Sequence, residues 1–133
     1  MTRFDDARLE FIYARGYESF NSGDLDSATY DFGFLILHRP LDFRFHFAFA
    51  CALKLHGEFR YAINFFCFAV AMKSDDPFCS FHIAECLLAL NEVESARDAL
   101  DAVISLCHGQ TNEGWRYDQL RHKAESMIIK LSR

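Results

Sequence analysis

The chain has 133 residues, of which 51% are apolar and 25% charged, enough for one domain that builds its core without metals or disulfides. Its net charge of −5 argues against a nucleic-acid-binding protein, because those proteins usually carry a basic stripe. With only 2 Pro and 6 Gly, the chain has too few turn residues for a β-sandwich or barrel, so an all-α fold is predicted.

Several observations bear on the compartment. The sequence has no run of 18 apolar residues, so we expect no stable membrane insertion. Residues 1–10 lack the apolar core of a signal peptide. The five Cys form no CxxC motif, which favours reduced thiols and a cytoplasmic protein.

The apolar periodicity predicts seven helices, near residues 6–22, 25–38, 43–56, 59–73, 77–90, 93–107 and 113–131. Small residues recur every 34 positions without a gap, first as Gly16, Ala50 and Ala84, then as Ala28, Ala62 and Ala96. This period and order are typical of the tetratricopeptide repeat, a helix–turn–helix unit. We therefore predict a single domain over residues 1–133, with three tandem repeats over about 9–42, 43–76 and 77–110.

The repeated positions have physical reasons. Small residues are expected where the two helices of a unit cross closely. Gly23, Gly57 and Asn91 share a column and suit the left-handed residue that ends a first helix. Asp42 and Asp76 are predicted N-caps, the second of them followed by a proline at the first helical position.

The last predicted helix, 113–131, has an apolar stripe of Tyr117, Leu120, Ala124, Met127, Ile128 and Leu131. It follows a break at Gly109 and a Thr111/Asn112 cap. A stack of repeats exposes an apolar end, and this helix is predicted to cover it.

Motifs for catalysis are absent from the sequence, including GxGxxG, GxxxxGK[ST], HExxH and GxSxG. Cys79, His82 and Cys86 could lie on one helix face and attract zinc, but they lack a fourth ligand, and buried Cys is common in cores. We therefore expect no enzyme activity, no metal and no cofactor.

A stack of this kind lines its concave side with the first helix of each unit. Tyr13, Phe47 and Phe81 are 34 residues apart and would form an aromatic column, on a face distinct from the core. An aromatic stripe at helical spacing can also be core, and that alternative stays open. The predicted peptide-binding residues are Tyr13, Tyr17, Phe20, Arg44, Phe47, Lys54, Phe81, Glu85 and Leu88, with Glu10, Asp42 and Asp75 completing a polar rim.

Two segments carry a closer resemblance, IYARGYESFNSGDLDSATYDF in the first unit and PFCSFHIAECLLALNEVESA in the third. Over about residues 9–107 the chain resembles the class II chaperones of type III secretion. The resemblance implies a small, ATP-independent cytoplasmic protein that holds secreted translocators, which have apolar membrane-active segments, before export. It also implies client contacts at Tyr13, Tyr17, Phe20, Phe47 and Phe81.

Alternatives remain open at this point. The chain could be a chaperone of a needle or filament subunit, or a generic repeat scaffold or regulator. Relatives often self-associate through an N-terminal helical arm, whereas about eight residues precede the first repeat here, and a homodimer stays open. The repeat core does not require the apolar side chains of Phe65 and Phe68, which could form a second contact surface.

Overall fold

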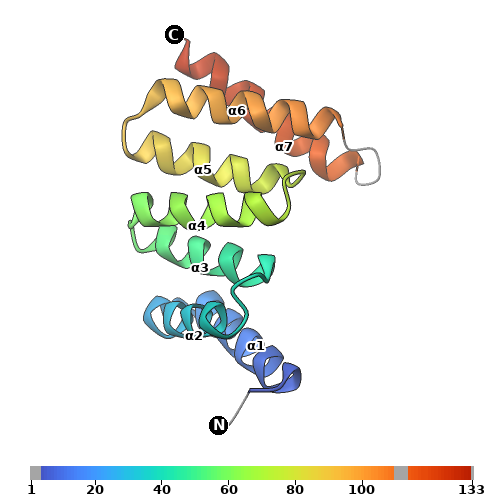
Figure 1. Cartoon of the computed structure of the whole chain (residues 1–133). Coiled ribbons are helices and arrows are strands. Elements are labelled where there is room, and N and C mark those ends of the chain that lie inside the picture. Colours follow the sequence, from blue (N-terminus) through green and yellow to red (C-terminus); the bar gives the residue numbers. More distant parts are fainter. Residues whose placement is uncertain (1–3, 110–113, 133) are drawn as a thin grey trace.

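The computed structural model describes residues 4–109 and 114–132, and Figure 1 shows these parts as helices without strands. Each helix lies within one residue of its predicted bounds. The seven helices are α1 Asp6–Ser22, α2 Leu25–His38, α3 Phe43–Leu55, α4 Phe59–Met72, α5 Pro77–Ala89, α6 Val93–His108 and α7 Gly114–Leu131. The predicted Thr111/Asn112 cap lies outside the described residues.

The helices stack in chain order, from α1 and α2 at one end to α6 and α7 at the other (Figure 1). Each hairpin, α1/α2, α3/α4 and α5/α6, packs on the next, and α7 packs on α6. The predicted all-α class is confirmed, and the arrangement is consistent with three repeats followed by a capping helix. None of the described helices is both long enough and apolar enough to cross a membrane.

The turns inside the three hairpins share one backbone geometry. Gly23, Gly57 and Asn91 have φ angles of 89°, 80° and 61°, in the left-handed region. After each of them, the next backbone N–H reaches back to a carbonyl near the end of the preceding helix, as from Asp24 to Ser19. The prediction that these three positions end the first helices is therefore confirmed.

The turns between hairpins use the predicted caps. The Asp42 carboxylate accepts the backbone N–H of Arg44, and the Asp76 carboxylate accepts that of Phe78. Pro77 stands at the start of α5, where its missing N–H costs no helical hydrogen bond. These caps set where α3 and α5 begin, and hence which of their faces meet the neighbouring hairpins.

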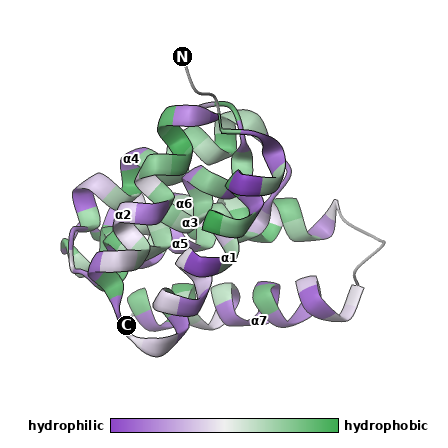
Figure 2. Ribbon diagram, turned by 90° about the horizontal axis from the view of Figure 1, so that it is seen from below, coloured by the Kyte–Doolittle hydropathy of each residue, from purple (hydrophilic) through white to green (hydrophobic). Residues whose placement is uncertain are grey.

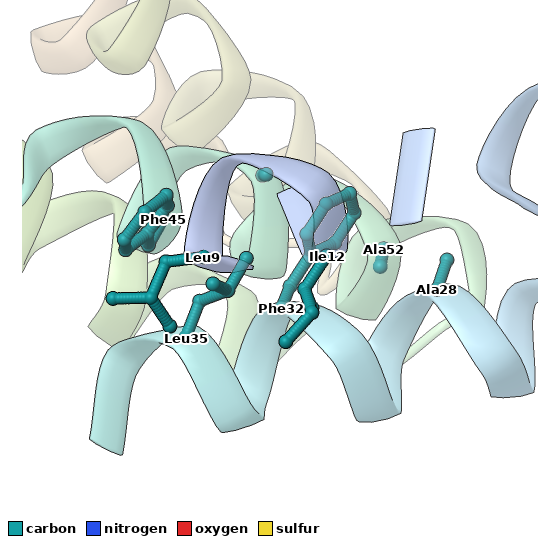
Figure 3. Close-up of a cluster of buried hydrophobic side chains, with 8 residues drawn as sticks. Leu9, Ile12, Ala28, Phe32, Leu35, Phe45 and Ala52 are labelled. Atoms are coloured by element: carbon teal, nitrogen blue, oxygen red, sulfur yellow. The ribbon is translucent and has the colours of Figure 1, made fainter. Parts of the chain in front are cut away.

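The core follows the small-residue columns. Ala28, Ala50, Ala62, Ala84 and Ala96 are completely buried. Figure 3 shows the cluster at the first hairpin, in which Phe32 of α2 lies among side chains of α1 and α3. Figure 2 shows how hydrophobic and hydrophilic residues alternate along each ribbon, as expected for helices that bury one face.

Gly16 is a position where α1 lies very close to α2. A Cβ atom built there would stand 2.6 Å from Cε1 of the fully buried Phe32 ring. We expect Gly16→Ala to lower the free energy of unfolding by about 1–2 kcal/mol, because overpacking outweighs the better helix propensity of Ala. Urea unfolding measures this.

Gly114→Ala is the matched control for Gly16, since a Cβ at Gly114 meets nothing within 4 Å. A Gly16→Ala protein as stable as the wild type would show that α1 and α2 can move apart at no cost.

Arg15 and Asp31 tie α1 to α2 beside this crossing. The guanidinium donates to both carboxylate oxygens, at 3.0 Å from Nε and 2.7 Å from Nη2. The Asp31 side chain is buried while Arg15 remains half exposed, so the pair fixes the first hairpin from its surface side.

Candidate functional site

Three aromatic rings of α1 form one continuous surface. The rings of Tyr13 and Tyr17 meet edge to face at 5.0 Å, and those of Tyr17 and Phe20 lie 6.1 Å apart. All three are half-buried, because they rest on the first core cluster on one side. Tyr17 packs against Phe32 at 5.2 Å. The exposed part of each ring is thus held in place by the core beneath it.

Phe47 of α3 presents another aromatic ring, packed on a different core cluster from the three rings of α1. Its ring lies 5.8 Å from Phe66 and 5.5 Å from the imidazole of His82, edge to face in both cases. Phe47 is half-buried, whereas Phe66 beneath it is completely buried. We call Tyr13, Tyr17, Phe20 and Phe47 the aromatic face.

The aromatic face carries no charge of its own. Burial raises the pKa of the Tyr17 phenol well above its ordinary value, and the neighbouring Tyr13 adds to the rise. Burial also raises the pKa of the Cys51 thiol to about 12. Both groups therefore stay neutral at physiological pH, and this surface suits apolar ligands.

Phe81, the third member of the expected aromatic column, lies in the core. Its side chain is 5% exposed and belongs to a cluster with Leu100, Val103 and Leu120. The Lys123 ammonium of α7 stands 5.0 Å from the ring centroid. The expectation that core and binding faces are separate therefore does not hold at Phe81, because α7 covers the position in the third repeat.

Five of the six predicted rim charges are paired with one another. Arg44 lies 2.6 Å from Glu10 of the preceding repeat and 3.0 Å from Asp42, and its guanidinium stacks over Tyr13 at 4.9 Å. Hydrogen bonds to the two carboxylates raise the pKa of Arg44 above its ordinary value. Arg44 therefore holds Tyr13 in place and joins the first two repeats.

Lys54 joins the second and third repeats. Its ammonium lies 2.6 Å from Oε1 of Glu85 and 3.0 Å from Nδ1 of His82. The imidazole stacks parallel to Phe66 at 5.0 Å.

Sequence reasoning identified Lys54 and Glu85, but it did not assign His82 to this surface. The sequence signal that could have indicated His82 is its position three residues, or one helical turn, before Glu85. Leu88 is half-buried on the same helix.

Burial lowers the pKa of His82 to about 4, and the charge of Lys54 adds to this effect. The unfolded chain therefore takes up a proton on His82 at a higher pH than the folded chain does. The contribution of neutral His82 to the free energy of unfolding is thus present above about pH 6.5 and is lost as pH falls towards 4. When the pH is lowered from 7.5 to 5.5, we expect the free energy of unfolding to fall by about 1 kcal/mol less in His82→Gln than in the wild type. Urea unfolding at each pH measures this difference.

His122→Gln, on the exposed surface of α7, serves as the control for this titration. Identical pH dependence in His82→Gln and the wild type would show that His82 is not held neutral in the folded state.

Cys79, His82 and Cys86 are the three residues that the sequence suggested as possible zinc ligands. Cys79 and Cys86 are completely buried, and His82 directs Nδ1 to Lys54. Burial raises the pKa of Cys86 to about 11. Within residues 4–109 and 114–132, no group of three or more His, Cys, Asp or Glu side chains is arranged to hold a metal.

A second apolar surface lies on α2 and α4. An apolar pocket of about 450 Å³ is lined by Thr29, Tyr30, Gly33, Phe34, Ile36, Leu37, Phe49 and Phe65. Tyr30 and Leu37 are 73% and 82% exposed at its edge, and Phe68 of α4 is 52% exposed. Phe65 is half-buried and packs on Phe49 at 4.7 Å, so it serves the core as well as this surface.

No family model matches the chain. Among curated proteins, the chaperone protein SicA of Salmonella typhimurium is 26% identical over 116 residues. The alignment covers 87% of this chain and 66% of SicA, slightly less than two thirds of that protein's length.

Solved structures match over a larger share of both chains. PcrH, a protein of Pseudomonas aeruginosa, in complex with the chaperone binding region of PopD, has a TM-score of 0.90 and 23% identity, covering 99% of this chain and 97% of that one. The Yersinia enterocolitica type III secretion chaperone SycD, bound to a peptide of the translocator YopD, has a TM-score of 0.88 and 24% identity, with coverages of 96% and 95%. Another structure of SycD is described as an alternative dimer.

A type III secretion complex from Aeromonas hydrophila gives a TM-score of 0.88 and 26% identity, covering 96% of this chain and 83% of that one. The chain thus has the all-helical fold of PcrH and SycD. The resemblance to type III secretion translocator chaperones, which the sequence indicated, is confirmed.

Proposed function

We propose that this chain is a type III secretion chaperone that holds an extended segment of a secreted translocator against its aromatic face. The observation that carries the proposal is the uncharged surface of Tyr13, Tyr17, Phe20 and Phe47, which the core holds in place. Solved structures of similar fold contain segments of PopD, PopB and YopD, which supports the same class of client here.

The mechanism needs binding but no chemistry. Each apolar side chain of the client that is buried against the aromatic face contributes about 1.5–3 kcal/mol. A few such anchors give roughly micromolar to nanomolar affinity after the ordering cost. Binding withdraws the unfolded client from aggregation and from early membrane insertion by mass action. We propose that this happens in the cytoplasm, without ATP or catalysis.

Co-purification from the native cell, with mass spectrometry of the bound species, tests the proposal. The expected client is a secreted protein with long apolar segments that is lost from Tyr17→Glu/Phe47→Glu and retained by Tyr30→Glu, whose change lies in the pocket of α2 and α4. Circular dichroism checks that each variant keeps its helices. A client lost only from Tyr30→Glu would contradict the assignment of the site.

The identity of the bound protein separates the alternatives. A small needle or filament subunit would favour the chaperone class that binds a helix. A folded protein held by its tail would favour a generic scaffold or regulator.

A further inference from the structure

His82 of α5 is fixed by contacts with both α3 and α4. Its imidazole stacks parallel to the buried Phe66 ring of α4 at 5.0 Å, and it meets Phe47 of α3 edge to face at 5.5 Å. Its Nδ1 lies 3.0 Å from Nζ of Lys54, and that ammonium lies 2.6 Å from Oε1 of Glu85. The stacking sets the plane of the imidazole, and the hydrogen bond sets which way its nitrogens face.

The same contacts decide which ring nitrogen of His82 carries the proton. A Lys ammonium has only donors, so Nδ1 accepts from Lys54 and the proton of the neutral ring is on Nε2. Glu85 does not favour the other tautomer, because its Oε1 is 3.8 Å from Nδ1, beyond hydrogen-bond range. Burial keeps the ring neutral by lowering the pKa of His82 to about 4. Nε2–H is therefore a fixed hydrogen-bond donor at physiological pH.

The Nε2–H donor has no acceptor within residues 4–109 and 114–132, the part of the chain that the structure describes. The His82 side chain is 26% exposed, and its Nε2 is not one of the unpaired polar atoms that the fold shuts off from solvent. The neighbouring ring, Phe47, belongs to the aromatic face. A ligand packed on Phe47 can therefore reach this donor.

We propose that Nε2–H of His82 donates a hydrogen bond to a backbone carbonyl of the client segment, next to the apolar side chain that packs on Phe47. The inference rests on the proposed function and deepens it, because this polar contact would set the register of the segment. An extended segment suits the donor, since its carbonyls have no partners of their own and recur on one side about every 7 Å. Lys54 and Glu85 neutralise each other beside the ring, which favours an uncharged acceptor over a carboxylate.

Backbone esters in a bound peptide test this proposal. The probe is a peptide selected on the full chain from a phage-displayed library of random peptides, and each of its amides is replaced in turn by an ester, whose carbonyl is a weaker acceptor. At one position, the ester is expected to bind the wild type about two- to tenfold more weakly than the amide, the effect of one net hydrogen bond. On His82→Phe, which keeps a ring over Phe66 but has no donor, this difference should disappear.

Two further variants separate the donor from a general effect on the fold. His82→Gln retains an N–H donor and should bind the amide peptide within about threefold of the wild type. His108→Phe makes the same change as His82→Phe at the exposed end of α6, and it should bind both peptides as the wild type does. Fluorescence anisotropy gives the affinities, and circular dichroism checks the helices.

Nuclear magnetic resonance of the wild type tests the donor even if His82→Phe folds poorly. Long-range ¹H–¹⁵N spectra, with His82→Gln to assign the signal, should show Nε2 protonated and Nδ1 unprotonated in the free protein. Once the peptide is bound, the Nε2 proton should exchange more slowly with water.

The outcomes distinguish the two proposals. A proton on Nδ1, an ester effect that persists on His82→Phe, or a His82-dependent contact to a side chain of the peptide would overturn the role of His82 and leave the proposed function intact. Selected peptides that bind Tyr17→Glu as tightly as the wild type would overturn the aromatic face itself.

Discussion

Tyr17→Glu is expected to weaken binding of the co-purified client's segment by about 100-fold, because it removes an apolar anchor and places a carboxylate on an uncharged surface. The phenol of Tyr17 lies between the rings of Tyr13 and Phe20 and rests on Phe32, so a glutamate there would stand among aromatic rings. Isothermal titration calorimetry with the client segment measures the effect.

Tyr17→Phe keeps the ring and removes only the hydroxyl, and it should bind within about threefold of the wild type. Equal losses in Tyr17→Phe and Tyr17→Glu would show that the hydroxyl, and not the apolar ring, holds the client.

Phe66→Ala is expected to have the largest effect on stability, lowering the free energy of unfolding by about 3–5 kcal/mol. The Phe66 ring is completely buried and contacts Phe47 of α3 and His82 of α5, so it joins three helices under the aromatic face. A domain of this size has only about 5–15 kcal/mol of total stability, so the melting temperature should also fall clearly. Chemical unfolding monitored by circular dichroism gives the value.

Phe68→Ala, two residues along the same helix, is the matched control. Its ring is 52% exposed, and its loss should cost about 1 kcal/mol or less. Similar costs at both positions would mean that α4 does not pack through Phe66 as described.

The helices could be predicted from the sequence because their signals are local. A left-handed Gly23 or Asn91 and a capping Asp76 act within a few residues of their own positions. The close crossing at Gly16 was also predictable, since the 34-residue period places this small residue opposite the second helix of its own unit.

Parts of the candidate site depended on contacts between distant elements. Phe81 has the same repeat position as Phe47, yet α7 covers it and leaves Phe47 half-buried. The charges at Arg44 and Lys54 were predicted as a rim for a client, but each pairs with a carboxylate of a neighbouring repeat. Such pairs form only once the repeats stack, and spacing within one repeat does not reveal them.

Site-specific photocrosslinking tests the central claim most directly. A benzoylphenylalanine in place of Phe20 on the aromatic face, and in a second protein in place of Tyr30 beside the α2–α4 pocket, is irradiated in cells that make the client. Mass spectrometry then identifies the crosslinked peptides. The proposed function predicts that position 20 crosslinks to one apolar segment of a secreted translocator and position 30 does not. Crosslinking of that segment at position 30 alone would contradict it.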